Sequence, residues 1–177
     1  VIYLAVKQYL AGRRSGTHKT LEKSELSGST RKLHKQKGTG GSRKGSIKNP
    51  LFKGGARIFG PRPRSYDFKL NKKVKSLAKY SALSVKAAGS SIKIVEDFSF
   101  DAPKTKEYIK FLTAFGLENK KSLLVLPELN DNVYLSSRNV QGAAIAIAEN
   151  LNTYEIMNNN TILISEKSIE AIANSQN

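Results

Sequence analysis

The spacing of apolar residues predicts two helices in the first half of the chain, with a long polar stretch between them. In 2–12 and again in 70–89 apolar side chains recur every three or four residues, and each run ends at a glycine. The expected inward faces are Ile2, Val6, Tyr9 and Leu10 in the first helix, and Leu70, Val74, Leu77, Ala78 and Ser81 in the second.

The second half of the chain alternates short apolar runs with helical patterns. Residues 123–126 are all apolar and a proline follows them, as expected of a strand buried on both faces of a sheet. The predicted strands are 91–96, 122–126, 132–135, 154–157 and 161–164. The predicted helices are 103–116, then 139–151 with Asn139 as its cap, and the stretch that Ser165 caps; their inward residues include Ile109, Leu112, Val140, Ile147, Ile169 and Ile172.

Strands that alternate with helices favour an α/β fold, here a three-layer sandwich with a mostly parallel central sheet. We expect this globular part to comprise residues 1–30 and 65–177. Residues 31–64 are expected to form a long, irregular, extended basic loop, because glycines and prolines punctuate this stretch and disfavour a helix.

The formal net charge of +16 is concentrated in one part of the chain. From Lys7 to Lys75 there are 20 lysines and arginines but only three carboxylates, and residues 26–66 contain none. Such a segment repels itself and can bury too little apolar surface to order alone, so it needs a polyanion, and nucleic acid is the abundant one. The cations of 31–64 are Arg31, Lys32, Lys35, Lys37, Arg43, Lys44, Lys48, Lys53, Arg57, Arg62 and Arg64.

A solvated helix face, a disordered tail and a membrane-binding segment all account less well for this charge. A helix face would interleave acids, and a basic tail would be terminal, whereas this segment is internal. Membrane adsorption usually needs a basic amphipathic helix, and no apolar run approaches the roughly 20 residues of a span, so no membrane contact is expected. The absence of cysteine excludes disulfides and thiolate metal sites.

No catalytic, nucleotide or metal motif is complete. The glycine-rich stretch 40–46 lacks the lysine that a phosphate-binding loop places after its second glycine, and Gly38 and Gly40 lack the third glycine of a dinucleotide fingerprint. His18 and His34 lie among cations, which favours surface polar contacts over zinc binding or base catalysis. We therefore expect no cofactor, no metal and no enzymatic activity.

The acidic residues after the predicted strands also have a simple structural interpretation. Asp97 and Asp101 precede Pro103 and are expected to act in turns and helix capping. Glu128 and Asp131 are likewise interpreted as turn residues.

An ordered series of motifs resembles ribosomal large-subunit protein four in its bacterial form. Within the basic segment they are Gln-Lys-Gly-Thr-Gly at 36–40, Gly-Ser-Ile-Lys-Asn-Pro at 45–50, Gly-Gly at 54–55 and Phe-Gly-Pro-Arg-Pro-Arg at 59–64. Further matches are Lys-Leu-Asn-Lys-Lys at 69–73, Ala-Pro-Lys-Thr-Lys at 102–106 and Ser-Ser-Arg-Asn at 136–139, so the resemblance covers nearly the whole chain.

The resemblance implies a cytoplasmic ribosomal protein that binds large-subunit (23S-type) rRNA, supports its assembly, and places its loop at the constriction of the peptide exit tunnel. Its implied partners are that rRNA, neighbouring ribosomal proteins including protein twenty-two across the tunnel, and the passing nascent peptide. To the cations it adds Gly38, Thr39, Gly40, Lys72 and Lys73 as rRNA contacts, and as tunnel-tip candidates Gln36, Lys37, Gly38, Thr39 and Gly40.

Several points stay open from the sequence. Phe52 and Phe59 could stack on splayed bases or wedge between rRNA helices. The resemblance implies a further N-terminal segment before residue 1, with additional strand structure. An RNA-processing or nucleotide-dependent enzyme on the same fold, and a repressor that binds its own leader RNA, are the alternative functions.

Overall fold

The computed structural model describes residues 1–174, and the chain forms two compact units. One, the body, comprises Val1–Ala11 and the chain from Phe68 onward. The other, the basic unit, is Gly12–Asp67. Residues 12–30 therefore lie in the same unit as the basic stretch 31–64, whereas the sequence grouped them with the globular part.

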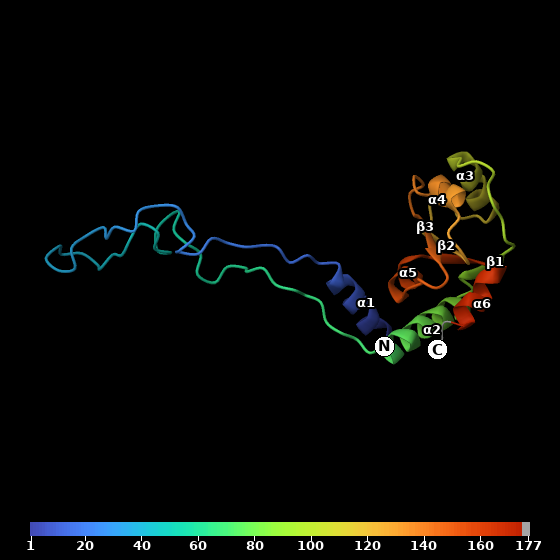
Figure 1. Cartoon of the computed structure of the whole chain (residues 1–177), viewed down its shortest axis with the longest axis horizontal. Coiled ribbons are helices and arrows are strands. Elements are labelled where there is room, and N and C mark those ends of the chain that lie inside the picture. Colours follow the sequence, from blue (N-terminus) through green and yellow to red (C-terminus); the bar gives the residue numbers. More distant parts are fainter. Residues whose placement is uncertain (175–177) are drawn as a thin grey trace. The chain divides into compact units, whose positions relative to one another are not determined.

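The body contains a four-stranded parallel sheet (Figure 1). Its strands lie in the order β1-β4-β2-β3, so the last strand of the chain is inserted next to the first. Leu124 of β2 lies opposite Ile145 of β3 and Leu163 of β4, which fixes the register of the three adjacent strands. The strands are β1 Ile92–Val95, β2 Ser122–Leu126, β3 Ala143–Ile147 and β4 Thr161–Ser165.

Helices cover both faces of the sheet, which confirms the α/β sandwich expected from the sequence. Helices α3 and α4 lie on one side, and α2, α5 and α6 lie on the other (Figure 1). The helices are α1 Ile2–Gly12, α2 Lys72–Ala88, α3 Thr105–Ala114, α4 Asp131–Ser137, α5 Thr153–Asn158 and α6 Glu166–Asn174.

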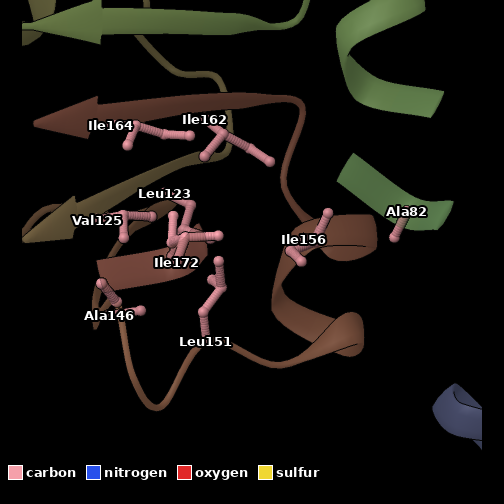
Figure 2. Packing of buried hydrophobic residues seen from close by; sticks show 10 residues of the cluster. Ala82, Leu123, Val125, Ala146, Leu151, Ile156, Ile162, Ile164 and Ile172 are labelled. Atoms are coloured by element: carbon pink, nitrogen blue, oxygen red, sulfur yellow. The ribbon is translucent and has the colours of Figure 1, made fainter. Parts of the chain in front are cut away.

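Two separate apolar cores result, because successive strand residues point to opposite faces. In β2, Leu123 and Val125 contribute to the core beneath α2, α5 and α6, where Figure 2 shows them beside Ile162 and Leu151. Leu124 contributes to the other core, beneath α3 and α4. All five residues of β2 are buried, as predicted for a strand enclosed on both faces.

The predicted strands at 91–96, 122–126 and 161–164 are confirmed, but those at 132–135 and 154–157 are wrong. Both stretches are short helices, α4 and α5. The side-chain oxygen of Asn130 accepts a hydrogen bond from the Val133 N–H (3.3 Å), and that of Asn152 accepts from the Glu155 N–H (2.9 Å). These asparagine caps satisfy backbone donors at each helix start and favour the helix over the strand.

The predicted helix at 139–151 is also wrong, since this stretch contains strand β3 and a following turn. Asn139 is therefore not a helix cap. The run Ala143–Ile147 is wholly apolar, and such a run has no period that separates a buried strand from a buried helix. Pairing with β2 decides its conformation, and Gly142, at φ +83°, leads the chain into the strand.

Some predicted inward positions face solvent instead. Leu77 is 56% exposed, whereas Ala78 and Ala82 are fully buried. The inward face of α2 thus carries small side chains, which let the helix pack closely on the core. Ile109 and Ile169 are likewise exposed. The predicted capping role of the acidic residues before α3 is wrong, since Lys104 is the N-cap residue and no side chain caps that helix.

The hydroxyl of Tyr108 is a buried polar group without a hydrogen-bond partner among the described residues. Burial raises the pKa of Tyr108 to about 12. We expect Tyr108→Phe to leave the free energy of unfolding unchanged or to raise it by about 1 kcal/mol, because an unsatisfied donor is removed. Urea unfolding of both proteins at pH 7 and pH 11 checks this.

The pH dependence has a definite sign. The pKa of the tyrosine is near 10 in the unfolded chain and about 12 in the folded protein. The stability of the wild-type protein is therefore unaffected by this group below pH 10, and it falls as the pH rises from 10 to 12, because the unfolded chain ionises first. The advantage of Tyr108→Phe should therefore grow by about 1 kcal/mol between pH 7 and pH 11. If Tyr108→Phe is less stable than the wild-type protein at both pH values, the Tyr108 hydroxyl must make a stabilising hydrogen bond, and the prediction is wrong.

Candidate nucleic-acid interface

The basic unit is built from an outgoing leg, residues 16–21, and a returning leg, residues 57–64, that run side by side in opposite directions. Residues 13–71 contain no helix or strand. Three backbone hydrogen bonds join the two legs, so the residues between them form one long loop. They are Arg64 N to Gly16 O (3.1 Å), Thr20 N to Pro61 O (3.1 Å) and Arg57 N to Leu21 O (3.2 Å).

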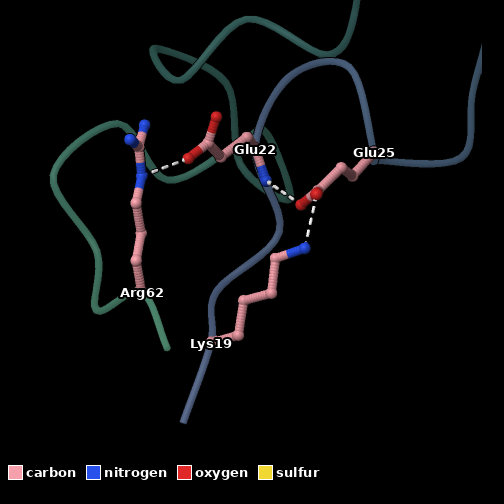
Figure 3. Close-up of polar contacts among 4 residues, drawn as sticks. All are labelled: Lys19, Glu22, Glu25 and Arg62. Carbon is pink, nitrogen blue, oxygen red and sulfur yellow. Dashed lines mark hydrogen bonds and ion pairs between the residues drawn. The ribbon is translucent and has the colours of Figure 1, made fainter. Parts of the chain in front are cut away.

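Ion pairs occupy both glutamates of this unit (Figure 3). Lys19 Nζ lies 2.5 Å from a carboxylate oxygen of Glu25, and Arg62 Nε lies 2.5 Å from one of Glu22. The hydrogen bond from Lys19, together with the Glu22 N–H, holds the pKa of Glu25 below its ordinary value. The Glu22–Arg62 pair links the two legs, whereas Glu25 pairs within the outgoing part of the unit. The two glutamates therefore neutralise only one of the eleven cations of 31–64, Arg62.

Two arginines, Arg14 and Arg64, contact the ring of Tyr66 by cation–π interactions. The guanidinium carbon of Arg14 lies 3.6 Å from the ring centroid, and that of Arg64 lies 4.5 Å from it. His18 Nε2 lies 3.0 Å from the Tyr66 hydroxyl. His18 thus makes the surface polar contact expected from the sequence.

A compact turn is present near the middle of the basic unit. The Ala56 N–H donates to the Lys48 carbonyl (3.1 Å), and Ala56 and Ser46 are both buried. Gly55 is required here, because a Cβ at this position would overlap the backbone carbonyl of Asn49.

We expect Gly55→Ala to disrupt this turn while Gly41→Ala has little effect. The Cβ of an alanine at 41 would meet nothing within 4 Å, whereas at 55 the backbone must move, at a cost of about 1–3 kcal/mol. Amide hydrogen exchange at Ala56 should become about tenfold faster in Gly55→Ala. Equal exchange rates in the two variants would show that the turn does not need the glycine.

The cations predicted from the sequence remain turned toward solvent. Of the eleven, only Lys44 and Lys48 are half-buried and the others are exposed. Within residues 1–174, Arg62 is the one member of this set with a carboxylate partner. Lys72 and Lys73 are exposed too, but they belong to the first turn of α2 in the body.

The predicted tip, residues 36–40, is exposed throughout. Gly38 and Gly40 have φ values of +84° and +66°, which favour glycine, and a Cβ at either would meet nothing within 4 Å. Lys32 Nζ donates a hydrogen bond to the side chain of Gln36. The backbone at these two glycines is thus bent and open to a partner.

Two large apolar side chains of the basic unit are almost entirely exposed. Phe59 is 99% exposed and Leu51 is 87% exposed, whereas Phe52 is half-buried. Both side chains are therefore accessible to a binding partner.

Acidic side chains gather at the carboxyl ends of β1 and β2. A cavity of about 510 Å³ at this edge is lined by Asp97, Glu128 and Asp131, and Lys167 pairs with Asp97 at 3.4 Å. No group of three histidines, cysteines or carboxylates in the described part of the chain could hold a metal ion. No helix among residues 1–174 is long and apolar enough to cross a bilayer.

These features define a class of protein: a parallel α/β body joined to an irregular, solvent-exposed, cationic segment suited to a polyanion. Comparison with known proteins gives the family. Residues 1–175 match the family described as "Ribosomal protein L4/L1 family". The chain therefore belongs to the ribosomal protein L4/L1 family, and the resemblance found in its motifs is confirmed.

Curated relatives agree along almost the whole chain. The "Large ribosomal subunit protein uL4" of Flavobacterium johnsoniae is 59% identical over 171 residues, which are 97% of this chain and 82% of that protein. The proteins of the same name from Phocaeicola vulgatus and Bacteroides fragilis are 58% and 53% identical, each over 98% of this chain and 83% of theirs.

Family membership settles the broad function. The chain is a structural constituent of the large ribosomal subunit and takes part in translation, in the ribosome of the cytoplasm. It is not an enzyme, as the sequence predicted, and the alternative of an RNA-processing or nucleotide-dependent enzyme is wrong.

Proposed function

We propose that the stretch 31–64 of the basic unit binds large-subunit rRNA and that the chain thereby supports assembly of the subunit. The observation that carries this proposal is the set of eleven cations in 31–64, of which nine are exposed and one is paired with a carboxylate. A folded unit seldom leaves so much like charge unpaired unless a polyanion neutralises it.

The residue types suit rRNA in several ways. Lysines neutralise phosphates as point charges, and arginines can bind them through two parallel hydrogen bonds. Gly38 and Gly40 offer backbone that RNA can approach without meeting a side chain. Phe59 provides an apolar ring for an unstacked base or for a gap between rRNA helices.

We further propose that Gln36, Lys37, Gly38, Thr39 and Gly40 form the tip that reaches the constriction of the peptide exit tunnel. There the tip would contact ribosomal protein twenty-two and the nascent peptide. The motif resemblance leads to this proposal, and the exposure of all five residues and the open space at both glycines support it.

Sedimentation of the tagged chain with ribosomes tests the first proposal. After a high-salt wash, we expect one copy per large subunit, retained through contacts that Lys35→Ala, Lys37→Ala and Arg43→Ala weaken. A chain that stays free, or that sediments only with other RNAs, would overturn it.

Crosslinking tests the proposed tip. A photoreactive group at position 37 should crosslink to a stalled nascent peptide or to protein twenty-two, whereas the same group at Lys110 of α3 should crosslink to neither. Equal crosslinking from both positions would contradict the tunnel assignment.

A further inference from the structure

A pocket of about 320 Å³ lies in the body, lined by residues of α1 and α2 and by the chain that enters α5. Every residue that lines it belongs to the body, so it is separate from the basic unit. Its volume falls at the lower end of the range for small-ligand sites. Its chemical character comes from Tyr9, Lys75, Lys79, Asn152 and Tyr154.

Two tyrosine rings form one wall of this pocket. Tyr9 of α1 and Tyr154 of α5 stack with their centroids 4.9 Å apart and their planes 20° from parallel. Each ring restricts the movement of the other, and both are half-buried. Such a pair offers a flat, already ordered surface on which another planar group can stack at little cost in side-chain entropy.

The polar groups around the pocket favour an anion. Lys75 and Lys79 line it from α2, and no carboxylate lines it. The side-chain oxygen of Asn152 already accepts from the Glu155 N–H, which leaves the amide NH₂ as a donor toward a ligand. The cavity of about 510 Å³ at the carboxyl ends of β1 and β2 differs, since three carboxylates, Asp97, Glu128 and Asp131, line it beside one cation, Lys167.

We propose that the pocket binds a nucleotide, with the base stacked on the Tyr9–Tyr154 pair and the phosphate held by Lys75 and Lys79. Aromatic stacking combined with cations is the usual arrangement for an unpaired base of single-stranded RNA. The nucleotide can be one residue of an RNA strand or a free mononucleotide, because both present the same base and phosphate. In the RNA form this inference rests on the proposed function and gives the body its own RNA contact.

The absence of tryptophan from the sequence makes a selective assay possible. In Tyr154→Trp the single indole lies in the pocket wall, so a base that stacks on it should quench its fluorescence. The full-length variant is titrated with adenosine 5′-monophosphate and, separately, with hexa-adenylate. Circular dichroism of the variant first checks that the body is folded.

Matched charge reversals locate the phosphate. When Lys75→Glu is added to Tyr154→Trp, the nucleotide concentration that gives half-maximal quenching should rise about tenfold, because a charge-assisted contact is lost. Lys110→Glu is the control, because it makes the same charge change at an exposed position on α3, outside the pocket lining. Equal weakening by both reversals would overturn the assignment of the phosphate to this pocket.

The two titrations separate the sources of the ligand. Quenching by both probes supports a site for RNA nucleotides, and quenching by the mononucleotide alone supports a free nucleotide as ligand. No quenching by either probe in the folded variant overturns the proposal. That failure would leave ribosome sedimentation unchanged, whereas failure of the proposed rRNA binding would abolish sedimentation and leave mononucleotide quenching intact.

Discussion

Replacing Lys35, Lys37 and Arg43 together by alanine is expected to weaken binding to deproteinised large-subunit rRNA roughly hundredfold at about 0.1 M salt. All three side chains are exposed, and none has a carboxylate partner among residues 1–174. Each lost phosphate contact also removes about one unit from the slope of log affinity against log salt. Filter binding at several salt concentrations should therefore give a slope smaller by about two to three units.

The control is a triple replacement in the body with the same change of net charge. Lys106, Lys110 and Lys120 are exposed, and they lie on or near α3. If the basic unit makes the phosphate contacts, their replacement by alanine should leave the slope almost unchanged. An equal loss of slope in both triples would show that the overall charge, and not this segment, determines rRNA affinity.

Ile162→Ala is expected to destabilise the body strongly, because it truncates a side chain at the centre of the sheet. Ile162 is fully buried in β4, where it lies opposite Ile92 of β1 and Leu123 of β2. Its loss leaves a cavity in the core beneath α2, α5 and α6, and such truncations reduce the free energy of unfolding by about 2–5 kcal/mol. Urea unfolding followed by circular dichroism measures the change.

Ile94→Ala is the matched control, since it removes the same atoms from the neighbouring strand. Ile94 belongs to the edge strand β1 and is 62% exposed, so little packing is lost and the expected cost is under about 1 kcal/mol. Comparable losses in both variants would mean that the edge of the sheet is covered more completely than its exposure indicates.

A prediction from the sequence was accurate where the residue pattern allows only one backbone conformation, and it failed where the pattern suits both a helix and a strand. The second strand was predictable because residues 123–126 are apolar and a proline ends the run. Strand β3 is equally apolar, but its alanines suit a helix as well as a strand, and only pairing with β2 separates the two. For α4 and α5 the capping residues Asn130 and Asn152 could have indicated helices. The prediction gave more weight to the apolar residues that follow them and assigned strands.

The candidate sites divide in the same way. The cations of 31–64 are contiguous in sequence, so composition alone was enough to find them. The tyrosine and lysine pocket combines residues from α1, α2 and α5, which lie far apart in the chain. The sequence places Tyr9 only on an apolar helix face, and it predicts for Tyr154 a strand where the structure has helix α5.

Residue types and their order were enough to predict the family, the α/β class, the concentration of positive charge and the lack of catalytic motifs. Each of these depends on residue type or on order along the chain. The folded structure was needed to establish the strand order β1-β4-β2-β3, the strand conformation of Ala143–Ile147 and the stacking of Tyr9 on Tyr154. The physical reason is that these features arise from contacts between distant segments, where burial and strand pairing outweigh the weak local preferences of short runs.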